Sequence, residues 1–129
     1  MRTSDERRAR VILSLVSEPG DPRFTSLARE LGGVGLLAAI REDAERHDLL
    51  LAASARLEQL DVDAELARAE RCGARFVMPG DEEWPAQLDD LAGVPPLNER
   101  GGVPIGLWVR GPLRLDALAG SVAIVGARS

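Results

Sequence analysis

The spacing of apolar residues changes near residue 74, and this change constrains the fold more than any other feature. Before it, apolar residues recur every three or four positions, which is the period of amphipathic helices. After it, short runs rich in β-branched residues alternate with Pro and Gly, as strands alternate with turns. We therefore predict an all-helical domain over residues 1–73 and the incomplete start of an α/β domain over residues 74–129.

Capping and helix-breaking residues divide the first part into helices. Ser4 and the acidic residues after it begin a helix, and the Pro-Gly-Asp-Pro sequence at 19–22 ends it. Thr25 or Ser26 caps a second helix, which the glycines within residues 32–35 break. The expected helices are residues 4–17, 25–31, 35–45 and 49–72, the last with a break at Asp61-Val62-Asp63 and an end at Gly73.

The second part has the pattern of short strands and short helices. Residues 74–78 and 106–111 predict strands, and residues 82–91 and 112–118 predict short helices. Residues 121–126 are apolar throughout, which is typical of a central parallel strand with helices over both faces. Such a strand needs a crossover helix and further strands, and the sequence ends soon after it. We therefore expect the chain to be a fragment.

The composition is that of a soluble globular protein. Hydrophobic residues make up 45% of the 129 residues and charged residues 29%, which argues against disorder. No apolar run near a terminus is long enough to cross a bilayer. The single cysteine, Cys72, excludes an internal disulfide and fits a reducing compartment. The net charge is −5 and all 16 basic residues are arginines, so bulk charge does not indicate a nucleic-acid wrapper.

Three segments of the second part carry a family resemblance. Residues 79–88 combine an acidic turn, a Trp-Pro pair and a leucine, although Tyr-Pro is the commoner pair in the family. A Pro-Leu pair at 96–97 and a Leu-x-x-x-Gly sequence at 107–111 follow. Residues 122–128 form a hydrophobic run that leads into Gly-Ala-Arg. In this order and spacing, the segments resemble the DNA-processing protein family DprA, also called Smf.

The resemblance implies both a fold and a function. The implied fold is a helical domain similar to SAM or helix-hairpin-helix modules, followed by a Rossmann-like parallel-sheet domain, of which only the start is present. Members of the family bind single-stranded DNA, load the RecA recombinase onto it and act in natural transformation. The resemblance implies no catalysis, no cofactor and no membrane. It also implies a cytoplasmic protein that forms a homodimer through the part of the Rossmann-like domain beyond Ser129.

The end of the chain is the candidate DNA phosphate-binding site. Gly126 lets the backbone turn tightly, and a helix after it would point its first amides at an anion. Arg128 and Ser129 would donate hydrogen bonds to phosphate oxygens, and the resemblance implies a DNA phosphate. Arg110 joins the same edge if its strand runs parallel to residues 121–126. The candidate residues are Gly126, Ala127, Arg128, Ser129 and Arg110; the alternative is a plain turn with surface arginines.

Other features have both a functional and a structural interpretation. The Gly-Gly-Val-Gly sequence at 32–35 resembles a helix-hairpin-helix turn, whose amides bind DNA phosphate, but the apolar residues after it favour a simple helix–helix turn. Trp84 and Trp108 either stack on bases or pack inside the protein, and packing is the commoner role. We interpret Arg7, Arg8 and Arg10 as a solvated helix face.

The remaining polar residues give little sign of chemistry. We explain the acidic residues at 81–83 by their place at a helix N-terminus. His47 has no second histidine or cysteine pair with which to bind a metal. Cys72 fits a small buried hydrophobic residue. No Ser-His-Asp or Cys-His set is suggested.

A second class of function stays open. A Rossmann-like nucleotide-binding enzyme, such as a nucleoside-phosphate hydrolase or an oxidoreductase, would share the expected fold. A dinucleotide-binding turn has glycine at its third position, where this sequence has Arg128, which disfavours that class without excluding it. A third interpretation is a fragment whose helices fold but which binds nothing.

Overall fold

Helices dominate residues 2–127, the part of the chain that the computed structural model describes. Two short strands and three short 3-10 helices complete the secondary structure of those residues. In chain order the elements are α1 (Arg2–Val16), α2 (Pro22–Glu42), η1 (Ala44–Arg46), α3 (Asp48–Glu58), α4 (Val62–Arg71), β1 (Ala74–Val77), η2 (Ala86–Gly93), β2 (Leu107–Arg110) and η3 (Leu115–Leu118).

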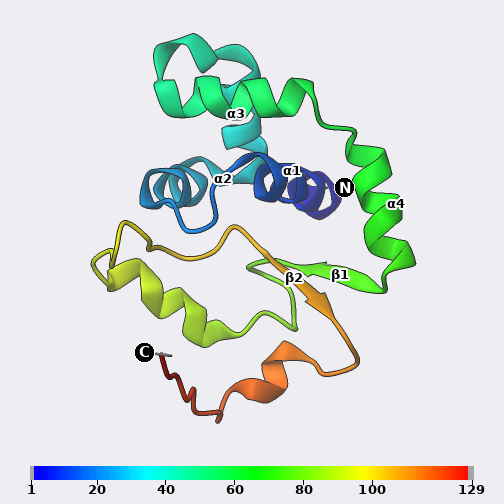
Figure 1. Ribbon diagram of the computed structural model, residues 1–129, viewed down its shortest axis with the longest axis vertical. Helices are drawn as coiled ribbons and strands as arrows, with labels where there is room; N and C mark the ends of the chain where they lie inside the picture. The colour runs from blue at the N-terminus through cyan, green and yellow to red at the C-terminus, as the bar shows by residue number, and fades with distance from the viewer. Residues whose placement is uncertain (1, 128–129) are drawn as a thin grey trace.

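The first three α-helices form the hydrophobic core. Helices α1 and α2 lie side by side, α3 packs across them, and α4 descends along one side towards the sheet (Figure 1). Full burial of a large aliphatic or aromatic side chain contributes about 1.5–3 kcal/mol, so this cluster dominates the stability. The buried cluster is Ala9, Ile12, Leu13, Val16, Phe24, Ala28, Leu36, Leu37, Ile40, Leu50, Ala53 and Ile105.

Helix α2 begins earlier than expected and bends where its glycines lie. Its N-cap is Asp21, whose carboxylate accepts a hydrogen bond from the Arg23 amide at 3.0 Å, and Pro22 occupies the first turn. The predicted cap at Thr25 or Ser26 is therefore wrong. Gly32 has a φ of 73° inside the helix, so the predicted break is a kink within one helix rather than a loop between two.

The predicted break after α3 is confirmed. Helix α3 ends at Glu58, and Asp61 caps α4 by accepting a hydrogen bond from the Ala64 amide at 3.0 Å. Gly73 follows α4 with a φ of 72°, a conformation that glycine adopts without strain. The chain then enters β1 at Ala74, where the sequence predicts the first strand.

The two strands form an antiparallel pair. Val77 pairs with Leu107 and Ala74 with Arg110, so the end of β1 lies beside the start of β2. Residues 78–106 return the chain to the end of β1, whereas a parallel pair would need a return to its beginning. The expected parallel sheet is therefore wrong for the strands that the structure describes. The sequence predicts a helix at residues 82–91. The observed helix, η2, is shorter and begins later, at Ala86, because the chain is still extended at Pro85.

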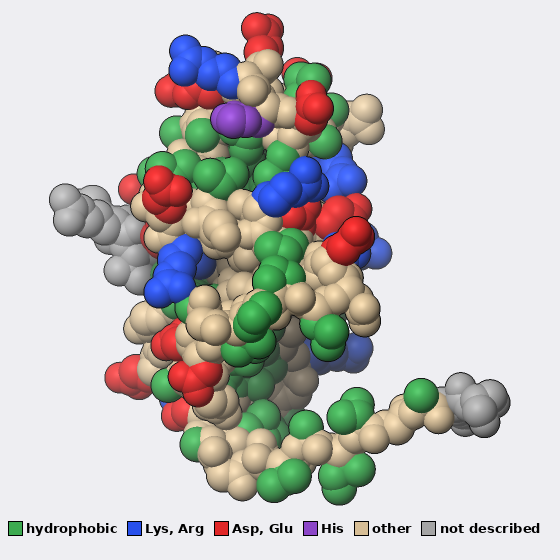
Figure 2. All heavy atoms as spheres, turned by 90° about the vertical axis from the view of Figure 1, so that its left-hand side faces the viewer, with side chains coloured by type: hydrophobic (Ala, Val, Ile, Leu, Met, Phe, Trp, Pro, Cys, Tyr) green, Lys and Arg blue, Asp and Glu red, His purple; other side chains and the backbone are tan. Residues whose placement is uncertain are grey.

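The predicted third strand does not form. Residues 121–127 have no regular secondary structure. Val122, Ile124 and Val125 are 84–95% exposed. Figure 2 shows this segment as an arm that leaves the body of the molecule and carries hydrophobic side chains. A strand needs a hydrogen-bonded neighbour, and no described segment lies beside this one.

The second half of the chain packs against α1. Ile105 is 8% exposed and belongs to the core cluster of the helices. The Arg10 guanidinium on α1 donates to the Ile105 carbonyl at 2.8 Å, and the Trp108 indole donates to the Ser14 hydroxyl at 3.2 Å. Residues up to β2 therefore share one core with the helices, while the domain division at residue 74 stays a prediction.

Candidate nucleic-acid interface

The predicted phosphate-binding residues lie in two separate places. Arg110 is exposed at the end of β2. Gly126 and Ala127 lie in the exposed C-terminal segment, and Arg128 and Ser129 lie outside the described residues. Figure 1 shows that the segment after η3 runs to the other side of the lower layer from the end of β2. The structure therefore does not bring Arg110 to Gly126.

Arg110 instead shares a face of the sheet with an exposed aromatic residue. Side chains alternate along a strand, so Trp108 and Arg110 of β2 point to one side with Phe76 and Ala74, their partners on β1. The rings of Phe76 and Trp108 meet edge to face, with centroids 5.1 Å apart. We call these four residues the Trp108 face. Trp108 is 39% exposed, and the face is the part of the sheet that combines an aromatic ring with a cation.

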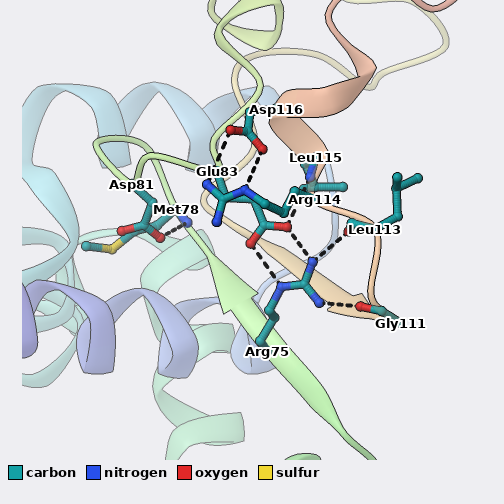
Figure 3. A network of polar contacts seen from close by, with 9 residues as sticks. All are labelled: Arg75, Met78, Asp81, Glu83, Gly111, Leu113, Arg114, Leu115 and Asp116. Carbon is teal, nitrogen blue, oxygen red and sulfur yellow. Dashed lines mark hydrogen bonds and ion pairs between the residues drawn. The ribbon is translucent and has the colours of Figure 1, made fainter.

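The opposite face of the sheet holds a half-buried ion pair that fixes the chain after β2. Arg75 donates to both carboxylate oxygens of Glu83. The same guanidinium donates to the carbonyls of Gly111, at 2.6 Å, and Leu113, at 2.8 Å (Figure 3). Glu83 also accepts from the Leu115 amide at 3.0 Å. Three of these hydrogen bonds tie β1 and the turn after it to residues 111–115, and the other two join Arg75 to Glu83.

This environment strongly favours the charged form of Glu83. The hydrogen bond from Arg75 is the largest cause, and it lowers the pKa of Glu83 from 4.5 to about 2. The role expected for the acidic run, at the start of a helix, is therefore wrong for this residue. Arg75 and Glu83 are eight positions apart, and nothing in the sequence indicates that a turn brings them together.

Asp81 makes a second ion pair, with Arg7 of α1. The Arg7 guanidinium donates to both carboxylate oxygens, at 2.9 and 2.5 Å, and also to the Phe76 carbonyl at 2.9 Å. The hydrogen bond from Arg7 is the main reason that the pKa of Asp81 is lowered. Arg7 and Arg10 therefore join α1 to the second half of the chain. The expected solvated helix face is wrong for these two residues and holds only for Arg8, which is exposed.

Backbone amides of the glycine-rich turn at residues 32–35 donate hydrogen bonds to a carboxylate of the protein itself. Glu6 accepts hydrogen bonds from the amides of Gly33, at 2.7 Å, and Val34, at 3.1 Å, and from Arg10 at 2.7 Å. Burial raises the pKa of Glu6, but the hydrogen bonds from Arg10, Val34 and Gly33 outweigh it, so the pKa is lowered. The amides that would face a DNA phosphate in a helix-hairpin-helix turn are engaged inside the protein. The glycines thus form a kink of α2 that packs against α1, so the structural interpretation holds, although the break lies within one helix.

The two tryptophans have different environments. Trp84 is 7% exposed, and its indole donates to Asp89 at 3.1 Å, so Trp84 is a packing residue. Trp108 is accessible and keeps the stacking interpretation open. Beside it lies a hollow of about 240 Å³, which α4 and the Trp108 face enclose together with Leu15 of α1. The residues that line this hollow are Leu15, Glu65, Arg68, Ala69, Cys72, Ala74 and Trp108.

Two further expectations concern Cys72 and metal ligands. Cys72 is exposed at the C-terminal end of α4, so the expected burial is wrong. Among residues 2–127, no group of three or more His, Cys, Asp or Glu side chains is placed to hold a metal ion. Within the same residues, no helix combines the length and apolarity that crossing a bilayer requires.

Comparison with known proteins finds two curated relatives of the chain. It is 32% identical over 125 residues to a curated protein from Mycobacterium tuberculosis strain CDC 1551 named "Putative DNA processing protein DprA". The protein of the same name from strain H37Rv matches equally well. The match covers 95% of this chain and 32% of each relative. No protein-family model and no solved structure matches the chain.

The chain belongs to the DprA family over the region that the match covers, which confirms the resemblance seen in the sequence. It spans about a third of the length of these relatives. Three segments carry that resemblance. Residues 79–88 form the turn after β1 and the start of η2, and residues 107–111 form β2 and the glycine after it. The described part of the third segment, residues 122–127, lies in the exposed C-terminal segment.

Proposed function

We propose that this chain binds single-stranded DNA as part of a DNA-processing protein of the DprA family. The 32% identity to proteins of that name over 95% of the chain carries the proposal. The exposed guanidinium of Arg110 supplies one phosphate contact in it. Gly126, Ala127, Arg128 and Ser129 are the predicted second contact. Because the net charge is −5, the contact is local rather than a broad basic surface.

The role of the longer protein follows from the family resemblance. We expect it to protect incoming single-stranded DNA in the cytoplasm and to load the RecA recombinase during natural transformation. It would act by binding, without catalysis and without a cofactor. The Rossmann-like domain and the homodimer through it stay predictions for that longer protein.

The test is the fluorescence anisotropy of labelled oligo-dT titrated with the chain over a series of salt concentrations. Two phosphate contacts on a single strand give a slope of log affinity against log salt of about −1.4. Arg110→Ala and Arg128→Ala should each weaken binding and reduce the slope by about 0.7. The control is Arg46→Ala, since Arg46 is exposed in η1, which packs against α2 and α3.

Three results would count against the proposal. If the chain leaves oligo-dT unbound at low salt, this part of the protein is not a single-strand binder. If Arg46→Ala and Arg110→Ala weaken oligo-dT binding equally, the binding is general electrostatic attraction and Arg110 marks no specific site. If nucleotides raise the melting temperature and oligo-dT does not bind, a nucleotide-binding enzyme becomes the better interpretation.

A further inference from the structure

We propose that the Trp108 face is a base-stacking platform, on which one base of a single strand lies against the Trp108 ring while Arg110 holds an adjacent phosphate. This inference rests on the proposed function and names the surface through which the DNA binds. It differs from the phosphate site expected at the end of the chain. The face and its hollow lie wholly within the described residues.

The ring is exposed although its polar group needs no water. Tryptophan often lies at a surface because its indole N–H needs a partner. Here that N–H donates to the Ser14 hydroxyl at 3.2 Å, yet the residue is still 39% exposed. The exposed part is therefore apolar ring, which gains free energy from contact with a flat partner. A base has a flat face of this kind, whatever its sequence.

The ring is also held in one orientation. Phe76 packs edge to face against Trp108. On its other side Phe76 lies against Gly106, where a Cβ would come within 2.1 Å of the ring. Phe76 is thus fixed by the backbone, and Trp108 is fixed by Phe76 and Ser14. A platform that is already ordered loses little entropy when a ligand stacks on it.

The charges near the ring suit a phosphate backbone. The register places Arg110 two residues from Trp108 on the same face. Arg68 of α4 lines the adjacent hollow. One carboxylate, Glu65, lines it too, but it lies 3.7 Å from the Arg68 guanidinium and is offset by it. Guanidinium groups beside an aromatic ring are the usual composition of a single-strand groove.

A larger hollow among the described residues does not suit DNA. It measures about 600 Å³ and lies between α1, the glycine-rich turn and the turn after β1. The charged residues that line it are Asp5, Glu6 and Asp81. Carboxylates repel a phosphate backbone, so the larger space is the poorer site. The smaller hollow of about 240 Å³ beside Trp108 is therefore the better candidate for a single planar ring.

The experiment follows Trp108 emission in a Trp84→Phe background, where Trp108 is the only tryptophan. Unlabelled oligo-dT should quench this emission along the same binding curve that anisotropy gives. Trp108→Leu in the native background should weaken oligo-dT binding by about tenfold, the scale of one stacked base. The matched control is Leu51→Ala, which removes an exposed apolar side chain of α3 and leaves the Trp108 face untouched. It should bind within about twofold of the native chain.

Each outcome separates this inference from the proposed function. If the chain binds oligo-dT but Trp108 emission and the affinity of Trp108→Leu are unchanged, the platform is wrong and the proposed function stands. If oligo-dT does not bind at all, both are wrong. Trp108→Phe, which keeps an aromatic ring against Phe76, should recover part of the affinity, whereas affinity no better than that of Trp108→Leu contradicts stacking. A duplex of equal length hides its bases, so its binding should not respond to Trp108→Leu.

Discussion

At Gly33 the helices α1 and α2 approach so closely that no side chain fits between them. A Cβ there would lie 2.6 Å from Glu6 Oε2 and 2.7 Å from Arg10 Cγ. Neither atom can move cheaply, because Glu6 is held by two amides and Arg10 by the Ile105 carbonyl. We expect Gly33→Ala to lower the free energy of unfolding by about 1–3 kcal/mol, measured by urea denaturation.

Gly93→Ala is the matched control for that substitution. No atom lies within 4 Å of the position that its Cβ would take. Its effect should stay within about 0.5 kcal/mol. Equal stability of the two variants would show that the helices do not meet at Gly33.

The ion pair of Glu83 leads to a second prediction for a single residue, which concerns the dependence of stability on pH. Its pKa is lowered to about 2 in the folded chain, against 4.5 ordinarily, so the folded state favours the carboxylate. The stabilisation is complete above about pH 5 and disappears as the pH falls towards 2. The melting temperature of Glu83→Gln should therefore lie below that of the native chain at neutral pH and approach it on acidification. A difference that is independent of pH would contradict the ion pair with Arg75.

At the scale of elements, the sequence predicts local structure better than pairing. The ends of α3, α4 and β1 follow from caps and glycines that act on their own neighbours, and those predictions are confirmed. The direction of the pairing between β1 and β2 depends on the path of residues 78–106, which no local pattern encodes. The contacts of Arg7 and Arg10 with the second half escaped prediction for the same reason.

The uncovered C-terminal segment gives a prediction at this scale. Its side chains at 122, 124 and 125 are 84–95% exposed, so they contribute no burial to stability. We expect removal of residues 122–129 to change the free energy of unfolding by less than about 0.5 kcal/mol in urea denaturation. A larger loss would mean that this segment packs on the body. The strand expected here was plausible from its composition, but a strand is a property of a sheet and not of one segment.

At the scale of the whole molecule, the two halves should unfold together. Ile105 comes from the second half and is buried among the helices of the first. Ile105→Ala should destabilise both halves by about 2–5 kcal/mol, the usual cost of this truncation in a core. Helical circular dichroism and the fluorescence of buried Trp84 should report the same lowered midpoint. Separate midpoints for the two signals would show that the halves fold independently.

The candidate DNA surface also belongs to the whole molecule, since α1, α4 and both strands build it. Its cation and ring could each be found in the sequence, because Arg110 and Trp108 are two positions apart in a predicted strand. Their shared face follows from strand alternation. The exposure of Trp108, the burial of Trp84 and the hollow under α4 depend on packing and could not be predicted.

The most direct test of single-strand binding is a titration of the isotope-labelled chain with oligo-dT, followed through its two indole N–H signals by NMR. We predict that the Trp108 signal shifts in a saturable way while the Trp84 signal stays in place, because Trp84 is buried and bonded to Asp89. Backbone signals at Arg110 should move together with that of Trp108. If the spectrum is unchanged at saturating oligo-dT, the chain does not bind single-stranded DNA, and the central claim is wrong.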